Sequence, residues 1–140
     1  MARADRNTIQ PKKIVIYRDF LTNFDQNPHT GFLATVTNED AIKQSYRNLV
    51  LTGRGERFYD AEKGAGIRDM LFELVTPEFN EALKLQIISS LNQSEPRGRV
   101  TDVQIQDNID ANEIAFRIVF TTANDQDQLY SLDLHIKRVR

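Results

Sequence analysis

The stretch SEPRG, residues 94–98, divides the chain into two parts with different spacing of apolar residues. Before it, apolar residues recur at steps of three and four, which is typical of helices that bury one face. After it they recur at every second position, which is typical of strands. Pro96 disfavours helical backbone at Glu95, so a helix is expected to end there. The sequence therefore predicts an α+β fold, with the helices first and the sheet last.

Three helices are predicted in the first part, and the third is expected to be covered on two sides, because Leu85 and Ile88 lie off its apolar stripe. The first starts at Asn38, whose side chain suits a capping position. The second stops before Pro77, because the residue ahead of a proline disfavours helical backbone. The third uses Thr76 as its N-cap and Pro77 as its first helical residue. The apolar stripes of the three helices are Ile42, Tyr46, Leu49 and Val50; Ile67, Met70, Leu71, Leu74 and Val75; and Phe79, Leu83, Ile87 and Leu91.

Three strands are predicted in the second part, where apolar and polar residues alternate. They run through Val103–Ile105, Ile114–Phe120 and Tyr130–Ile136. The connecting segments, DNIDAN at 107–112 and TANDQDQ at 122–128, are rich in turn-forming residues. We therefore expect about three helices packed on one face of a C-terminal antiparallel β-meander.

Length and composition indicate one folded domain. A chain of 140 residues fits a single domain, and it holds no cysteine for disulfides. Residues 1–12 are charged and are interpreted as a mobile arm, so we expect a single domain over residues 13–140. The net charge of -2 does not suit a nucleic-acid partner. No run approaches the roughly 18 apolar residues that would span a bilayer, so no membrane partner is expected either.

Neither a metal nor a cofactor is expected. The two histidines, His29 and His135, stand alone, without acidic or cysteine neighbours at metal-ligand spacing. The glycines at 53–55 lack the Gly-Lys-Ser/Thr that follows in a phosphate-binding loop, and those at 64–66 lack the third glycine of a dinucleotide-binding turn. Both are interpreted as parts of one long, backbone-permissive loop, residues 52–66.

The abundant carboxylates raise the possibility of a glycosidase, which holds two acidic groups across a sugar cleft. The candidates are Glu56, Glu73 and Glu95. A general acid needs its pKa raised by an apolar pocket, whereas Glu56 is flanked by arginines and Glu95 is closely followed by Arg97. Because nearby cations lower the pKa of a carboxylate, we expect no catalytic residue and no enzyme.

Glu95 and Arg97 suggest a charged clamp. If the segment around Pro96 runs extended, residues two apart project to the same side. The pair would then form a rigid fork of opposite charges, held outward for a partner protein and ordered in advance by the proline. A plain charged turn between helix and strand fits the same residues, so both interpretations stay open.

Several segments together resemble a known family. They are the helix start Ala41–Ser45, Leu51–Thr52 ahead of Gly55–Arg57, Gly66, the block Leu71–Glu73, and Glu95–Arg97. In order and spacing, across roughly residues 14–120, they are similar to the baseplate wedge proteins of contractile-tailed, T-even-like phages, the GPW or gene-twenty-five-like family. Members often carry proline after the Gly-Glu-Arg triplet, where this chain has Phe58, so the local turn is expected to differ.

The resemblance implies a structural subunit of a tail baseplate, which contacts other wedge proteins and the tail sheath subunit and initiates sheath assembly. Its location would be the tail baseplate of the virion, after assembly in the host cytoplasm. In such proteins the Glu-Pro-Arg segment docks onto the wedge core. The family also carries a lysozyme label, which leaves a peptidoglycan hydrolase as an alternative function. Related subunits occur in type VI secretion systems and other contractile injection machines.

A strand-addition mechanism is predicted for the sheath contact. The terminal strand, residues 129–138, would leave an edge of unpaired backbone groups to which a sheath subunit adds its own strand. Polar and basic residues on this strand would discourage indiscriminate pairing. The predicted partner-binding residues, from this strand, the charged clamp and the glycine-rich loop, are Glu95, Pro96, Arg97, Glu56, Arg57, Leu132, Leu134 and Ile136.

Overall fold

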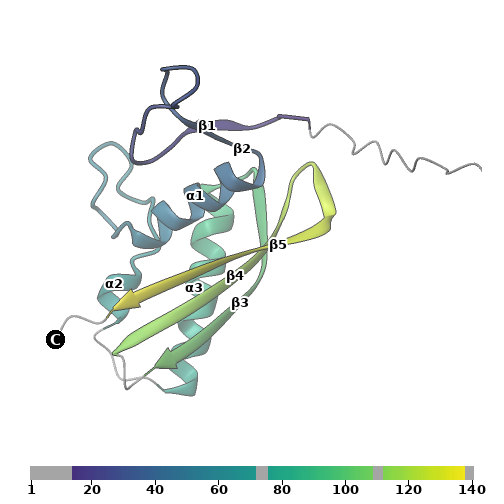
Figure 1. The fold of residues 1–140 in the computed structure, drawn as a ribbon. Coiled ribbons are helices and arrows are strands. Elements are labelled where there is room, and N and C mark those ends of the chain that lie inside the picture. The colour runs from purple at the N-terminus through teal and green to yellow at the C-terminus, as the bar shows by residue number, and fades with distance from the viewer. Residues whose placement is uncertain (1–13, 72–75, 109–111, 138–140) are drawn as a thin grey trace, which may run out of the picture. The chain divides into compact units, whose positions relative to one another are not determined.

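The computed structural model describes residues 14–71, 76–108 and 112–137, and they form two compact units. The boundary between the units lies between Asn38 and Glu39. Figure 1 shows a strand pair in the first unit, and helices followed by a three-stranded sheet in the second. The predicted arm at residues 1–12 falls outside the described residues, and the single domain expected over 13–140 stays a prediction.

The first unit is built on a short antiparallel pair, β1 (Arg18–Phe20) and β2 (Thr35–Thr37). Asn38, directly after β2, has a φ of 50° and extends this pairing with its side chain. Its Oδ1 accepts hydrogen bonds from the backbone N–H of Ile16 at 2.9 Å and of Tyr17 at 3.3 Å. The predicted capping role of Asn38 is therefore wrong, because its amide serves the preceding strand segment and its backbone is not extended as an N-cap requires.

The second unit begins with three helices, α1 (Glu39–Leu51), α2 (Ile67–Met70) and α3 (Pro77–Ser94). Both α1 and α3 bury the predicted apolar stripe. The second covered side expected for α3 is wrong at Leu85, which is 65% exposed. The buried stripe residues are Ile42, Tyr46, Leu49 and Val50 in α1, and Phe79, Leu83, Ile87 and Leu91 in α3. Of the second predicted stripe, Leu74 and Val75 lie outside the described residues.

The start of α3 follows its sequence signal closely. Thr76 has extended backbone, its Oγ1 accepts a hydrogen bond from the backbone N–H of Phe79 at 3.1 Å, and Pro77 occupies the first turn. The side-chain oxygen therefore satisfies one of the N–H groups that no helical carbonyl can reach. The predicted N-cap is confirmed.

Replacing Thr76 with alanine is expected to lower the free energy of unfolding by about 1 kcal/mol, because it removes this cap. Urea denaturation followed by circular dichroism measures the change. Ser89→Ala, at an exposed position inside the same helix, is the matched control and should be neutral or slightly stabilising. Equal losses in both variants would contradict the capping role.

The C-terminal sheet contains β3 (Gly98–Asn108), β4 (Glu113–Thr122) and β5 (Asp125–Lys137), in the order β3-β4-β5 with antiparallel neighbours. All three predicted strands are present. The predicted connection at 122–128 is wrong, however, because β5 already starts at Asp125 and the turn is only two residues long. The polar residues Asp125–Gln128 form the exposed first part of β5, where alternation with buried apolar residues is not required.

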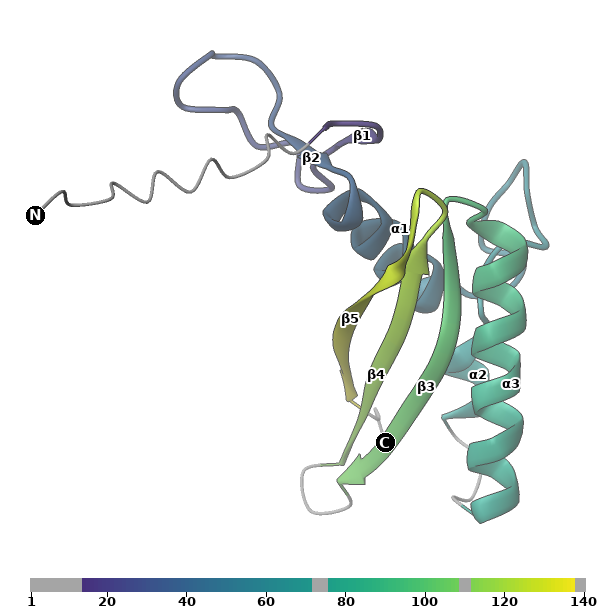
Figure 2. The same cartoon turned by 90° about the vertical axis from the view of Figure 1, so that its right-hand side faces the viewer.

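One face of this sheet forms the core of the second unit with the helices. Figure 2 shows α3 alongside the sheet, and Lys84 of α3 pairs with Asp102 of β3 at 2.7 Å. Tyr46 of α1 meets Phe120 of β4 edge to face, with ring centroids 5.0 Å apart. The buried apolar residues alternate along β4 and β5, whereas in β3 a register shift between Val100 and Asp102 separates the two buried valines by three positions. They are Val100, Val103, Ile114, Phe116, Ile118, Phe120, Leu134 and Ile136. Across the described ranges, no helix combines the length and apolar character needed to span a membrane.

Candidate functional site

The segment that joins α3 to β3 is a tight turn. The backbone N–H of Gly98 donates to the carbonyl of Glu95 at 3.4 Å, which places Pro96 and Arg97 in the middle of the turn. The carbonyl of Arg97 accepts a hydrogen bond from the N–H of Ala123 at 2.8 Å, so the turn is also attached to the β4–β5 connection. The extended course predicted for this segment is wrong, because the φ fixed by proline suits the second position of a turn equally well.

Glu95 and Arg97 pair with each other inside this turn. Arg97 Nε donates to Glu95 Oε1 at 2.8 Å and Nη2 donates to Oε2 at 2.7 Å, which is the bidentate arrangement. The Glu95 residue is only 5% exposed, whereas the Arg97 side chain retains 27% exposure. The prediction that both charges project outward is therefore wrong for Glu95. The Glu95 carboxylate turns inward, where it accepts hydrogen bonds from Arg97 and from Ser45 of α1.

The charge state of Glu95 follows from its neighbours. Burial alone would raise the pKa of Glu95, but hydrogen bonds from Arg97 and Ser45 and the charge of Arg97 hold the pKa below its usual value. The prediction that a nearby cation lowers the pKa of Glu95 is confirmed. A group that stays ionised in this way stabilises the turn and is poorly suited to donate a proton as a general acid.

Gly98 closes the turn against α1. A β-carbon at this position would lie 2.5 Å from Tyr46 Oη and 2.9 Å from Ile42 Cγ2, so only glycine allows the approach. The Tyr46 hydroxyl is buried and has no hydrogen-bond partner among the described residues. Burial, with a smaller effect of the Glu95 charge, raises the pKa of Tyr46, so the ring packs as a neutral phenol.

The contributions of Ser45, Tyr46 and Gly98 to this site were missed in the sequence. Gly98 was visible as the residue after Glu-Pro-Arg, and Ser45 as the end of the helix start that carries the family resemblance. Neither position shows, from local pattern alone, that α1 and the turn would meet. The contact joins residues about fifty positions apart and depends on the packing of the whole unit.

Glu56 and Arg57 lie in the loop between α1 and α2, residues 52–66. Glu56 Oε2 accepts a hydrogen bond from the backbone N–H of Gly53 at 2.7 Å, so this carboxylate stabilises its own loop. Arg57 is exposed. Glu73, the remaining carboxylate considered for catalysis, lies outside the described residues. Within the described ranges, no three acidic or histidine side chains gather as ligands for one metal ion.

The apolar residues of the last strand that are named among the predicted partner-binding residues face the core of the unit. Leu134 is 2% and Ile136 is 8% exposed, and Leu132 is half-buried. These side chains therefore pack inside the unit, and the partner contact predicted for this strand through its backbone stays a prediction. A neighbour can still reach β5 through its backbone, because β5 lies at one end of the strand order β3-β4-β5.

The opposite face of the sheet is polar. Arg117 of β4 pairs with Asp133 of β5 at 2.7 Å, and His135 lies 3.0 Å from Glu113 across the same two strands. A shallow pocket of about 150 Å³ opens on this face. Its lining residues are Gln104, Gln106, Ala115, Phe116, Arg117, Asp133 and His135. Glu95 is not among them, so this pocket does not pair the candidate catalytic carboxylates.

Helices followed by an antiparallel sheet give the second unit an α+β fold, and the Glu95–Arg97 pair fixes the turn between the two parts. The family described as baseplate wedge protein gp25 matches residues 36–127, from β2 into β5. The chain therefore belongs to the gp25 family of baseplate wedge proteins, which confirms the predicted resemblance. Baseplate wedge protein gp25 of Enterobacteria phage T4 is 27% identical over 96 residues, which cover 69% of this chain and 73% of that protein.

Solved structures share this fold. A crystal structure from Geobacter sulfurreducens described as a tail lysozyme superposes with a TM-score of 0.67 at 22% identity and covers 76% of this chain and 98% of its own. A chain of the anti-feeding prophage baseplate gives 0.60 at 24% identity, covering 85% and 83%. A chain of the postcontracted pyocin R2 baseplate gives 0.51 at 18% identity, covering 82% and 98%. At these identities the likeness establishes the architecture alone.

Proposed function

We propose that the chain is a structural, non-enzymatic subunit of a contractile-tail baseplate wedge, which docks on the wedge core through the turn Glu95–Gly98 and initiates tail sheath assembly at its sheet edge. The observation that carries the proposal is the bidentate Glu95–Arg97 pair in a chain of the gp25 family. A turn ordered before binding loses little conformational entropy on docking. The proposed location is therefore the tail baseplate of the virion.

The docking surface consists of what the turn leaves accessible. Pro96 is exposed, and the Arg97 side chain keeps 27% exposure while its guanidinium is bound to Glu95. The buried carboxylate fixes the arginine in one orientation, so a partner meets a rigid cation beside a rigid proline ring. A carboxylate or backbone carbonyl group on the wedge core is the complementary partner chemistry.

The sheath contact is proposed at β5. Its apolar residues already pack on the core, so an added strand would pair through the backbone of Asp125–Lys137 and keep the core intact. The exposed charges of Asp133 and Lys137 on this strand would select the register of the incoming strand. The sheath subunit is expected to supply the complementary charges.

The test is made in the particles that incorporate the chain. We expect mass spectrometry to find the chain stoichiometrically in purified tails, and cryo-electron microscopy to show a sheath strand paired with β5 and a wedge protein on Pro96 and Arg97. Without the chain, baseplates should lack sheath. Sheath that polymerises normally in its absence would contradict the initiator role, and a sheath strand paired with β3 would contradict the proposed edge.

A cell-wall hydrolase is the second candidate, because the fold is shared with a protein described as a tail lysozyme. Purified chain is expected to leave the turbidity of a peptidoglycan suspension unchanged, since Glu95 is held ionised by Arg97. Clearing that Glu56→Gln or Glu95→Gln abolishes would favour the hydrolase. The likeness to the anti-feeding prophage and pyocin baseplates leaves other contractile injection particles as alternative hosts of the same structural role.

A further inference from the structure

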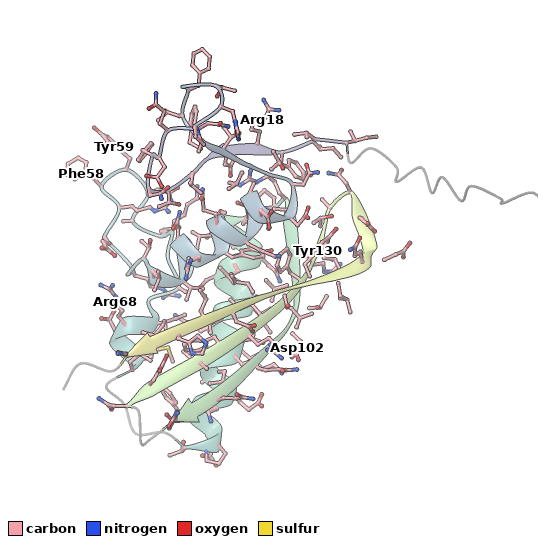
Figure 3. All side chains as sticks on the ribbon, in the orientation of Figure 1. Arg18, Phe58, Tyr59, Arg68, Asp102 and Tyr130 are labelled. Carbon is pink, nitrogen blue, oxygen red and sulfur yellow. The ribbon has the colours of Figure 1, made fainter. Side chains whose placement is uncertain are left out.

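The loop at residues 52–66 presents two aromatic side chains almost completely to solvent. Phe58 is 92% exposed and Tyr59 is 97% exposed, more than any other large apolar residue among those described. Figure 3 labels both rings on the outer side of the loop. They contact each other edge to face, with centroids 5.2 Å apart and an interplanar angle of 82°. Neither ring adds to the core, so the fold does not explain the pair.

Backbone hydrogen bonds and close packing hold the loop that carries this aromatic pair in a defined conformation. Its neck is closed by a hydrogen bond from the backbone N–H of Gly55 to the carbonyl of Ala61 at 2.8 Å. Gly64, with a φ of 131°, lies so close to the start of the loop that a β-carbon would be 2.7 Å from the Thr52 carbonyl oxygen. Any other residue would therefore open the neck.

The far end of the loop is tied to the helices. Ala65 is fully buried, its N–H donates to the carbonyl of Leu49 at 3.1 Å, and its own carbonyl accepts from Gln86 Nε2 of α3 at 3.1 Å. Near the tip, Lys63 pairs with Asp60 at 2.8 Å. The aromatic pair is thus held at a defined place on the second unit, which is the pre-organisation that favours tight protein contacts.

The charges around the pair indicate what kind of partner it meets. The loop holds three basic residues and three acidic ones, which gives it no net charge. They are Arg54, Arg57 and Lys63, and Glu56, Asp60 and Glu62. An anionic membrane surface or a nucleic-acid strand would select a basic excess around such aromatics. A protein pocket with an apolar floor and a rim of both charges matches the loop better.

A second copy of the chain does not provide that pocket on its described sheet face. The cavity there has a volume of about 150 Å³, and its lining mixes Ala115 and Phe116 with polar side chains such as Arg117. A cavity of this volume has room for about one aromatic ring, so it does not accommodate both Phe58 and Tyr59. The receptor is therefore expected on a different subunit.

We infer that Phe58 and Tyr59 form an aromatic anchor that inserts into an apolar, charge-rimmed pocket of another protein subunit of the baseplate. This inference rests on the proposed assembly role and adds a contact separate from the Glu95–Gly98 turn. Aromatic residues on rigid loops are typical hot spots, in which a few side chains supply most of the binding free energy. The ends of the loop stay as they are, and only the tip changes environment on docking.

The decisive experiment replaces the tip and follows entry into purified particles. Phe58→Ser with Tyr59→Ser should leave the melting temperature within about 2 °C of wild type, because both rings are exposed, and should reduce incorporation at least about tenfold. Leu85→Ser, at a position 65% exposed on α3, is the matched control and should incorporate normally. Phe58→Tyr with Tyr59→Phe keeps both rings and should restore incorporation.

A photo-crosslinking amino acid identifies the receptor. At position 58 it should link to one other baseplate subunit in assembled particles, and at position 85 it should not link to that subunit. If the wild type is present in particles, either of two results would overturn the anchor and leave the proposed function standing. One is a serine variant that enters particles equally well, and the other is the absence of any crosslink from position 58. A link to a second copy of the chain would also overturn it. Absence of wild type from particles would overturn both.

Discussion

Arg97→Ala is expected to lower the free energy of unfolding by about 2 to 3 kcal/mol at neutral pH. The substitution removes both side-chain hydrogen bonds from the guanidinium to Glu95, which is 5% exposed and would remain as a buried carboxylate without its counter-charge. Arg99→Ala, at an exposed position two residues further along, is the matched control and should change stability by less than about 0.5 kcal/mol. Urea denaturation measures both variants.

The effect of Arg97→Ala depends on pH, and the sign follows from Glu95. In the wild type the pKa of Glu95 is lowered below 4.5, so its stabilising contribution is fully present above that pH and is lost as the pH falls through the folded pKa. In the variant, burial acts without the arginine and should raise the pKa of Glu95. The two proteins should therefore differ most near pH 7 and converge as the pH falls below 4.5. A constant difference from pH 7 to pH 4 would contradict the pairing.

Stability and docking can be separated at the same turn. Glu95→Leu with Arg97→Met replaces the ion pair by apolar side chains of similar length, and such replacements are often neutral for stability. The purified double variant should show the same cooperative unfolding transition as the wild type. It should nevertheless fail to enter wedges. Normal incorporation of the double variant would show that the charged pair is only a structural turn.

The sequence predicted well those elements in which apolar residues recur at a regular spacing within the element itself. The steps of four in α3 and of two in β4 come from one buried face in each element, and each face can be recognised within a dozen residues. The start of β5 at Asp125 was not predictable in this way, because its first residues are exposed and polar and show no alternation. The N-cap prediction for Asn38 was wrong for another reason, because its side chain accepts hydrogen bonds from the backbone of Ile16 and Tyr17.

The site shows the same division between local and distant causes. Glu95 and Arg97 are two residues apart, so their electrostatic coupling was predictable from the sequence, and its direction is confirmed. Their orientation was not, because it depends on Ser45 and Tyr46 of α1, about fifty residues earlier. The alternation in the last strand marks a buried face, which the chain's own core provides for Leu134 and Ile136, whereas the partner contact predicted at the strand edge has no local pattern of its own.

Gly98→Ala is expected to destabilise the second unit by about 3 kcal/mol, and to lower its melting temperature by about 10 °C. The added methyl group would lie 2.5 Å from Tyr46 Oη and 2.9 Å from Ile42 Cγ2, and both side chains are fully buried. Gly53→Ala is the matched control, because its nearest neighbour would be Glu56 Oε2 at an ordinary 3.5 Å. Thermal unfolding followed by circular dichroism compares the two variants.

Tyr46→Phe tests the cause of that loss. Alone, it should be neutral or slightly stabilising, because the hydroxyl it removes is buried without a hydrogen-bond partner among the described residues. Combined with Gly98→Ala, it removes the nearest atom in the clash, so the double variant should regain about 1 kcal/mol while Ile42 Cγ2 still obstructs the methyl group. If the two substitutions were simply additive, the close packing of α1 against the turn would not be what requires glycine at position 98.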